Sequence, residues 1–231
     1  MKTRSHLSTA WTATCFMLFA MHCHGATLVR DGQPAAVIGV PTGPTDVEAL
    51  AAKELIAHIE MMSGAALELR EVAPATVKDF IATCAKAKKL PVLIGLAAAD
   101  GAQKKAQAFS DRDGTLILKV LDDRIHITGR GDGTLFAAYE LLEQLGVRWF
   151  MPGKIGMVIP RTKTVSLSRQ DTIQHPGFSG RFFGVTDNLM EKLQNQSGET
   201  WFRRMRMGGF YAGNHGLGIQ ADAETEPALF M

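Results

Sequence analysis

Residues 129–153 read GRGDGTLFAAYELLEQLGVRWFMPG, and this stretch decides the fold. After a glycine-rich turn, the apolar residues recur at helical spacing: Leu135, Ala138, Tyr139, Leu142 and Leu145. This period predicts a helix with one buried face. Gly146 stands where a helix favours a left-handed residue after its last turn, so the helix is expected to stop there. A short strand carrying Arg148, Trp149 and Phe150 should follow and end at a Pro-Gly turn.

A second strong helix is expected between residues 45 and 64. Thr45 begins it, and Glu48 follows three residues later, which is the pattern of a capping box. One apolar stripe runs along the segment through Val47, Leu50, Ala51, Leu55, Ile59 and Met62. Gly64 is the expected C-terminal stop, so the helix has signals for both of its ends.

The remaining pattern alternates strands with weaker helices. Strands are expected at 27–30, 35–40, 67–72, 90–95, 115–120, 124–128, 158–159 and 164–167, the last two as a pair, and helices at 76–88 and 97–109. Two of the connections read as hairpins, which a purely parallel, doubly wound sheet would not contain. The sequence therefore predicts an α+β fold, with a mixed β-sheet and two main helices on one face.

Composition limits the class of protein. The chain has 231 residues, of which 46% are hydrophobic and 21% charged, which suits one globular domain with part of a second. Its formal net charge is only +2, and the basic residues are scattered along the chain, so a nucleic-acid partner is not expected.

The N-terminal residues 1–26 read as a secretory signal peptide. Lys2 and Arg4 form a basic start, residues 7–21 are largely apolar, and small residues follow as a cleavage point. The apolar stretch is short for a membrane span, so no membrane association is expected beyond this signal, although a retained anchor is the alternative. The protein is therefore expected to be secreted or periplasmic.

Cysteine and histidine usage gives no sign of a disulfide, a metal or another cofactor. Cys15 and Cys23 would leave with the signal, and the remaining Cys84 cannot form an intrachain disulfide. The run from His22 to His24 resembles a metal cluster, but it lies within the signal. Cys84 is expected to be a buried small hydrophobic residue.

Three stretches carry a resemblance to a known group of proteins: 54–64 (ELIAHIEMMSG), 92–95 (VLIG) and 129–153. They resemble the N-terminal accessory domain of large glycoside hydrolases, namely the α-glucuronidases, the β-N-acetylhexosaminidases and related bacterial proteins with an uncharacterised barrel domain. The resemblance covers about residues 27–168 in layout. It implies an accessory α+β domain there, followed at 169–231 by the truncated start of a (β/α) barrel.

The second segment supplies the candidate substrate contacts. Residues 175–181 (HPGFSGR) resemble the start of the first barrel strand, where a Pro-x-Phe-x-x-Arg segment places an arginine on sugar hydroxyls. The resemblance implies this role for Arg181, whose planar fork of donors suits paired sugar oxygens. The sequence departs at 182–184, where FFG replaces the usual glycine. A surface or ion-paired arginine is the alternative.

Residues 201–208 (WFRRMRMG) resemble the first barrel helix of the uncharacterised proteins, which would place Asn214 and His215 at the end of the second barrel strand. Barrel enzymes hold their chemistry at that end, so both are candidate substrate contacts. A structural role is the alternative for His215.

The arginines of 201–208 are expected to be solvated or ion-paired. The apolar residues after Asp171 are expected to have too few packing partners, because the rest of their barrel would be missing.

The catalytic residues are not identified in this sequence. Glycoside hydrolysis uses two carboxylates that flank the scissile bond, and in the resembling families these come from later barrel strands. Glu140 and Glu143 are three residues apart, which predicts a solvated helix face. The chain is thus expected to be the N-terminal portion of a secreted glycoside-hydrolase-like protein, inactive alone, whose partners are a carbohydrate substrate and its own barrel. A non-catalytic carbohydrate-binding or structural module is the alternative, although Trp149 and Phe150 suit an interface core better than a sugar platform.

Overall fold

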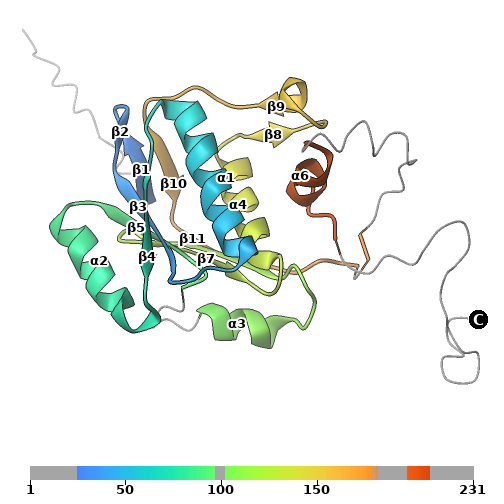
Figure 1. The fold of residues 1–231 in the computed structure, drawn as a ribbon, viewed down its shortest axis with the longest axis horizontal. Helices are drawn as coiled ribbons and strands as arrows, with labels where there is room; N and C mark the ends of the chain where they lie inside the picture. The colour runs from blue at the N-terminus through green and yellow to red at the C-terminus, as the bar shows by residue number, and fades with distance from the viewer. Residues whose placement is uncertain (1–24, 97–101, 179, 182–196, 209–231) are drawn as a thin grey trace, which may run out of the picture.

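The computed structural model describes residues 25–96, 102–178, 180–181 and 197–208 (Figure 1). The strands are β1 (Gly25–Arg30), β2 (Gln33–Pro34), β3 (Ala36–Pro41), β4 (Glu68–Val72), β5 (Leu90–Ile94), β6 (Leu116–Val120), β7 (Ile125–Gly129), β8 (Arg148–Trp149), β9 (Met157–Val158), β10 (Val165–Ser168) and β11 (Gln170–Gln174). The helices are α1 (Asp46–Ser63), α2 (Val77–Lys86), α3 (Ala102–Phe109), α4 (Gly133–Gln144) and α6 (Ser197–Arg204), with 3₁₀ turns at Pro74–Thr76 and Lys154–Gly156.

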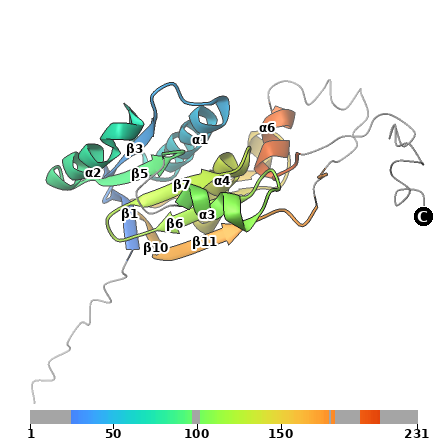
Figure 2. The same ribbon diagram turned by 90° about the horizontal axis from the view of Figure 1, so that it is seen from below.

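A mixed six-stranded sheet is the centre of the fold, in the order β11-β6-β7-β5-β3-β4. The strands β4, β3, β5 and β7 run parallel to one another, whereas β6 pairs antiparallel with both β7 and β11. Helices α1 and α4 pack together on one face. Figures 1 and 2 show α2 and α3 on the other side of the sheet. The prediction of an α+β fold with a mixed sheet and two main helices on one face is confirmed.

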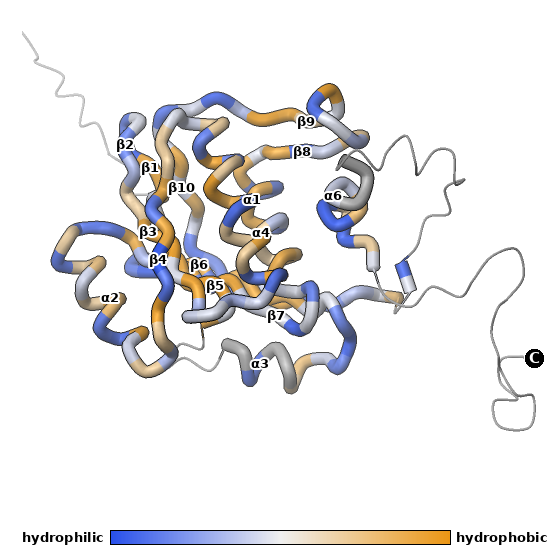
Figure 3. The backbone as a smooth tube through the Cα atoms, in the orientation of Figure 1, coloured by the Kyte–Doolittle hydropathy of each residue, from blue (hydrophilic) through white to orange (hydrophobic). Residues whose placement is uncertain are grey.

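The core lies between the sheet and the pair α1 and α4. Successive strand residues point to opposite faces, so Ile38 and Ile94 join the core under α1 and α4, while Val37 and Leu93 face α2. Figure 3 shows the resulting pattern, in which the central strands are apolar. Both faces of the sheet are therefore apolar along β3 and β5, which explains why these strands read as continuous apolar runs.

The glycines of the 129–153 stretch allow α4 to begin close to β6. A Cβ on Gly133 would lie 1.9 Å from the carbonyl oxygen of Thr115, and one on Gly129 would lie 2.4 Å from the same oxygen. Only a residue without a side chain fits at such an approach. These glycines thus serve the packing of the helix against the strand.

The predicted helix ends are confirmed. The side chain of Thr45 accepts a hydrogen bond from the Glu48 amide and the Glu48 side chain accepts one from the Thr45 amide, which completes the capping box of α1. Gly64 and Gly146 adopt left-handed conformations, with φ of 80° and 93°. After α4, the amide of Val147 donates to the Leu142 carbonyl oxygen at 3.0 Å, as in a Schellman motif.

Two short pairings differ from the expectation. The segments at 158 and 165 do not pair with each other: β9 pairs with β8, and β10 pairs with β1 in a separate three-stranded sheet with β2. Strands this short lack a period that selects a partner, so the sequence pattern does not specify their pairing. Trp149 in β8 is buried, whereas Phe150 is 70% exposed, so the interface role expected for Phe150 stays a prediction.

The main sheet continues beyond the segment 27–168. Strand β11 adds to its edge next to β6 and begins just after residue 168. The division into 1–26, 27–168 and 169–231 otherwise stays a prediction, and residues 1–24 lie outside the described part. The helix expected near 201–208 is present as α6 and ends at Arg204. Within the described ranges, no helix has the length and apolar character needed to cross a membrane.

Candidate functional site

Helix α6 lies against α1, α4 and β8, as Figure 1 shows, and charged side chains line this contact. We name it the arginine seam and define it by Arg181, Arg204 and Arg206 with Glu54, Glu140 and Glu143. The acidic members come from α1 and α4, and the arginines come from α6 and its flanks. The seam is therefore the contact between the folded domain and the chain that follows its last strand.

The pair Arg204 and Glu54 is the centre of the seam. The Arg204 Nε donates to Glu54 Oε2 at 2.9 Å, and Nη2 donates to Oε1 at 3.1 Å. Glu54 is only 8% exposed, and the guanidinium lies 5.4 Å from the ring centroid of Trp149. A bidentate, charge-assisted pair that also stacks on an aromatic ring fixes the position of α6.

A chain of hydrogen bonds extends this contact into the core. The Trp201 Nε1 donates to the Trp149 carbonyl oxygen at 2.9 Å, and the Trp149 Nε1 donates to His58 Nε2 at 3.1 Å. Because Nε2 accepts, His58 Nδ1 carries the proton and donates to the Glu54 carbonyl oxygen at 2.8 Å. Burial lowers the pKa of His58, and the hydrogen bond to Glu54 and its charge only partly oppose this effect.

Lowering the pH is expected to weaken the folded state through His58. Its folded pKa lies below the ordinary value of about 6.5, so the unfolded chain binds more protons below that pH. The contribution of neutral His58 is therefore fully present above pH 6.5 and is lost as the pH falls below 6.5 and through the lowered pKa of the folded state. Glutamine keeps one donor and one acceptor, so His58→Gln should flatten the pH dependence of the urea midpoint between pH 7 and 5. An unchanged pH dependence in His58→Gln would contradict this assignment.

Arg206 forms the second half of the seam. Its Nη2 donates to Glu140 Oε2 at 2.7 Å and also contacts Glu143. Both glutamates are half-buried, so the expectation of a solvated face is wrong. The physical reason is that α6 covers this side of α4. Arg206 also has a left-handed φ of 55°, at a helix end where glycine is preferred. The backbone strain of a non-glycine residue there lowers the stability of the fold by roughly 1 kcal/mol relative to glycine.

Arg181, the predicted sugar-binding arginine, also lies at the seam. Its Nε donates to the Arg206 carbonyl oxygen at 2.9 Å, and its Nη1 donates to the Phe178 carbonyl oxygen at 2.9 Å. Its backbone pairs with Gly208 as an isolated β-bridge. The side chain lines a cavity of about 140 Å³ that Gln174, His175 and Arg206 also border. Arg181 thus holds two backbone segments together, and its role toward a sugar stays a prediction.

The other predicted contacts, Asn214 and His215, lie outside the described residues and stay predictions. The expected shortage of packing partners is wrong for Trp201, which is half-buried against the core and hydrogen-bonded to β8. Sequence reasoning missed Glu54 and His58. The available signal was a pair of polar residues at i and i+4 beside the apolar stripe of α1, where two ionisable side chains need partners.

The seam does not have the arrangement of a glycosidase active site. The carboxylates of Glu54, Glu140 and Glu143 are all bound by arginine, and the cavity beside Arg181 has no carboxylate in its described lining. Glycosidases need two carboxylates across a substrate-sized space. Among the described residues, no group of three or more His, Cys, Asp or Glu side chains could hold a metal ion. The geometry of the seam is that of an intramolecular docking contact.

No protein-family model matches the chain, and a search of curated proteins finds no match. Among solved structures, the chain is similar to a family GH115 4-O-methyl-α-glucuronidase with specificity for decorated arabinogalactans. The match has 16% sequence identity and a TM-score of 0.46, and it covers 66% of this chain and 19% of that enzyme. The chain thus spans about a fifth of the enzyme's length, and this distant likeness assigns no residue a role.

Proposed function

We propose that residues 25–174 form a non-catalytic accessory domain in a secreted glycoside-hydrolase-like protein, and that the arginine seam holds the following segment against it. The observation that carries the proposal is the buried, bidentate pair between Arg204 and Glu54. A domain whose outer helical face binds the next segment suits an accessory role. The resemblance of 54–64, 92–95 and 129–153 to hydrolase accessory domains gives the proposal its carbohydrate context.

The alternative use of the seam, binding a substrate, is less well supported by its chemistry. The guanidinium of Arg204 is largely buried and donates hydrogen bonds to Glu54. The guanidinium of Arg181 donates hydrogen bonds to two backbone carbonyl oxygens. A substrate would have to displace these contacts, and each displaced partner would need a new one. The catalytic carboxylates are therefore proposed to come from a later part of the protein.

Hydrolysis of aryl glycosides tests the proposed function. The chain of residues 1–231 and the product of a reading frame extended beyond residue 231 would be assayed on aryl α-glucuronides and aryl β-N-acetylhexosaminides. We expect no turnover by residues 1–231 and turnover of one substrate class by the longer product. Turnover by residues 1–231 would contradict the accessory role, and a longer product that is inactive on both classes would contradict the hydrolase assignment.

A further inference from the structure

The hairpin of β8 and β9 exposes a cluster of large apolar side chains. Phe150, Met151, Ile155 and Val158 are each at least 50% exposed, and Ile155 reaches 90%. Figures 1 and 3 show this hairpin at the edge of the domain, beside α6. Single exposed apolar residues are ordinary, whereas a contiguous group of them marks an interaction surface. We name these four residues the apolar tip.

The domain beneath the apolar tip fixes its shape. Trp149 and Met157 pair across the two strands and pack onto the core. The Phe150 amide donates to the Gly156 carbonyl oxygen at 2.8 Å, and a Cβ on Gly156 would lie 2.3 Å from Met151. The four residues of the apolar tip lie outside the core clusters of the described residues. The tip is therefore a preformed surface that the domain does not use for its own packing.

The chain around the apolar tip carries only positive charge. Residues 144–164 contain Arg148, Lys154, Arg161 and Lys163, all exposed, and no Asp or Glu. None of these four cations forms an ion pair with another described residue. The surface therefore favours an occupant that combines apolar side chains with negative charge.

Residues 209–231, which come after α6 in the chain and lie outside the described part, have the complementary composition. They contain Asp222, Glu224 and Glu226 and no Lys or Arg. Their large apolar residues are Phe210, Tyr211, Leu217, Ile219, Leu229, Phe230 and Met231. The segment thus matches the tip in both charge and apolar character.

The segment also starts within reach of the tip. A Cβ on Gly208 would lie 3.8 Å from Asp132, which immediately precedes α4. The hairpin follows the other end of α4, a helix of 12 residues and about 18 Å. An extended chain spans roughly 3.3 Å per residue, so residues 209–231 can run from Gly208 along α4 to the hairpin. Because Trp201 of α6 already donates to the Trp149 carbonyl oxygen of β8, the tip continues the contact that the arginine seam begins.

We propose that residues 209–231 dock on the apolar tip, with their acidic residues beside its cations. The proposal rests on the proposed function, because the arginine seam holds the start of this segment against the domain. A stable contact between separate molecules uses roughly 20–30 residues on each side, more than this hairpin offers. A tethered segment needs fewer, since its covalent link gives it an effective concentration of about a millimolar. The occupant is therefore part of the same chain rather than a second copy.

Paramagnetic broadening of amide signals in the chain of residues 1–231 tests this docking. With Cys15 and Cys23 replaced by serine and Cys84 buried, a nitroxide can be attached at Ile155→Cys alone. We expect a strong loss of intensity at the amides of 209–231, relative to the same sample after the nitroxide is reduced.

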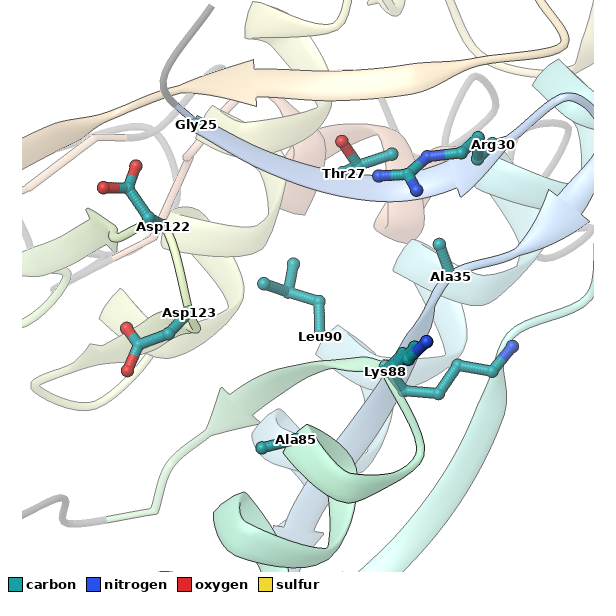
Figure 4. Close-up of a pocket in the computed structure, with 10 residues that line it drawn as sticks. Gly25, Thr27, Arg30, Ala35, Ala85, Lys88, Leu90, Asp122 and Asp123 are labelled. Carbon is teal, nitrogen blue, oxygen red and sulfur yellow. The ribbon is translucent and has the colours of Figure 1, made fainter. Parts of the chain in front are cut away.

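The matched control places the nitroxide at Lys88→Cys. Lys88 follows α2, which Figure 1 shows on the opposite side of the molecule from the hairpin. It borders a cavity of about 270 Å³ together with Arg30, while the side chains of Asp122 and Asp123 point away from this cavity (Figure 4). Cations gather there too, but the lining includes no exposed large apolar side chain. This nitroxide should leave the amides of 209–231 at full intensity.

Two further variants, made in the Ile155→Cys chain, separate the apolar and the charged parts of the contact. Phe150→Ser removes an exposed ring without opening the core, and it should shift the docking equilibrium about tenfold toward the undocked state. Replacing Asp222, Glu224 and Glu226 by lysine should release the segment through repulsion from the hairpin cations. Leu69→Ser removes a similarly exposed apolar side chain from β4, and it should leave the intensity loss unchanged.

The proposal is overturned if 209–231 keep full intensity in the Ile155→Cys chain, if the nitroxide at Lys88→Cys broadens them equally, or if either releasing variant keeps the full loss. Broadening of an isotope-labelled chain by a separate spin-labelled chain would identify a second copy as the occupant. Full intensity at 209–231 with sedimentation of the chain on phosphatidylglycerol vesicles would identify an anionic lipid surface. Both of these results would also overturn the proposal.

The docking and the arginine seam fail separately. Slow amide exchange at 205–207 without broadening at 209–231 would overturn only the docking on the apolar tip. Broadening at 209–231 with fast exchange at 205–207 would overturn only the seam and the accessory role built on it.

Discussion

Replacing Arg204 by leucine is expected to release α6 from the domain while the sheet stays folded. Glu54 would lose both of its hydrogen bonds to Arg204 and would be left as a carboxylate that α6 covers. An unpaired buried charge costs about 3–5 kcal/mol, and this cost opposes the docking of α6. The helix should therefore detach, because detachment lets water solvate Glu54.

Limited trypsin digestion measures this release, because Arg203 and Arg206 become cleavable when α6 detaches. Arg204→Leu should be cut there much faster than the unmodified chain. The double variant Glu54→Met with Arg204→Leu should recover most of the resistance, since an apolar pair of similar size can replace a buried ion pair. Arg70→Leu breaks the exposed pair with Glu68 and should leave the cleavage rate unchanged. Resistance in Arg204→Leu equal to that of the unmodified chain would contradict the docking role.

Gly133→Ala is expected to destabilise the whole domain by about 3 kcal/mol, the upper range for inserting atoms into a packed site. The new Cβ would lie 1.9 Å from the Thr115 carbonyl oxygen, and backbone atoms cannot move aside as a flexible side chain can. The start of α4 would have to shift relative to β6. Because α4 contributes a large share of the core, this shift would loosen its packing throughout.

Gly64→Ala is the matched control for this effect. Gly64 has a left-handed φ of 80°, but nothing lies within 4 Å of a Cβ there. Its substitution should cost only about 1 kcal/mol, from backbone strain alone. Urea denaturation of both variants gives the two free energies of unfolding. A Gly133→Ala loss no larger than that of Gly64→Ala would show that the close approach to Thr115 does not constrain the fold.

The parts of the fold that were predictable from sequence are those with local causes. Thr45, Glu48 and Gly64 set the ends of α1 through contacts only a few residues apart, and Gly146 does the same for α4. The mixed sheet followed from the hairpin signal that pairs β6 with β7. The hairpin expected between 27–30 and 35–40 is wrong, because β1 pairs with the short β2 and β3 joins the main sheet. The pairing of β8 with β9 and of β10 with β1 was not predictable, because such short strands carry no period of their own.

The candidate site was less predictable, because its contacts join residues that are far apart in the chain. Glu54 and Arg204 are separated by 150 positions, and each alone reads as an ordinary charged helix residue. Arg181 was singled out through a family resemblance, yet its role in bridging to Gly208 has no signal in the sequence.

Amide hydrogen exchange over residues 201–208 of the unmodified protein is the most direct test of the arginine seam as a docking contact. The amides of Met205, Arg206 and Met207 are hydrogen-bonded at the end of α6. A helix of this length is not stable alone in water, so protection there requires docking. We predict slow exchange at these three amides, lost in Arg204→Leu. Exchange at the rate of an unstructured peptide in the unmodified protein would contradict the seam and the accessory role built on it.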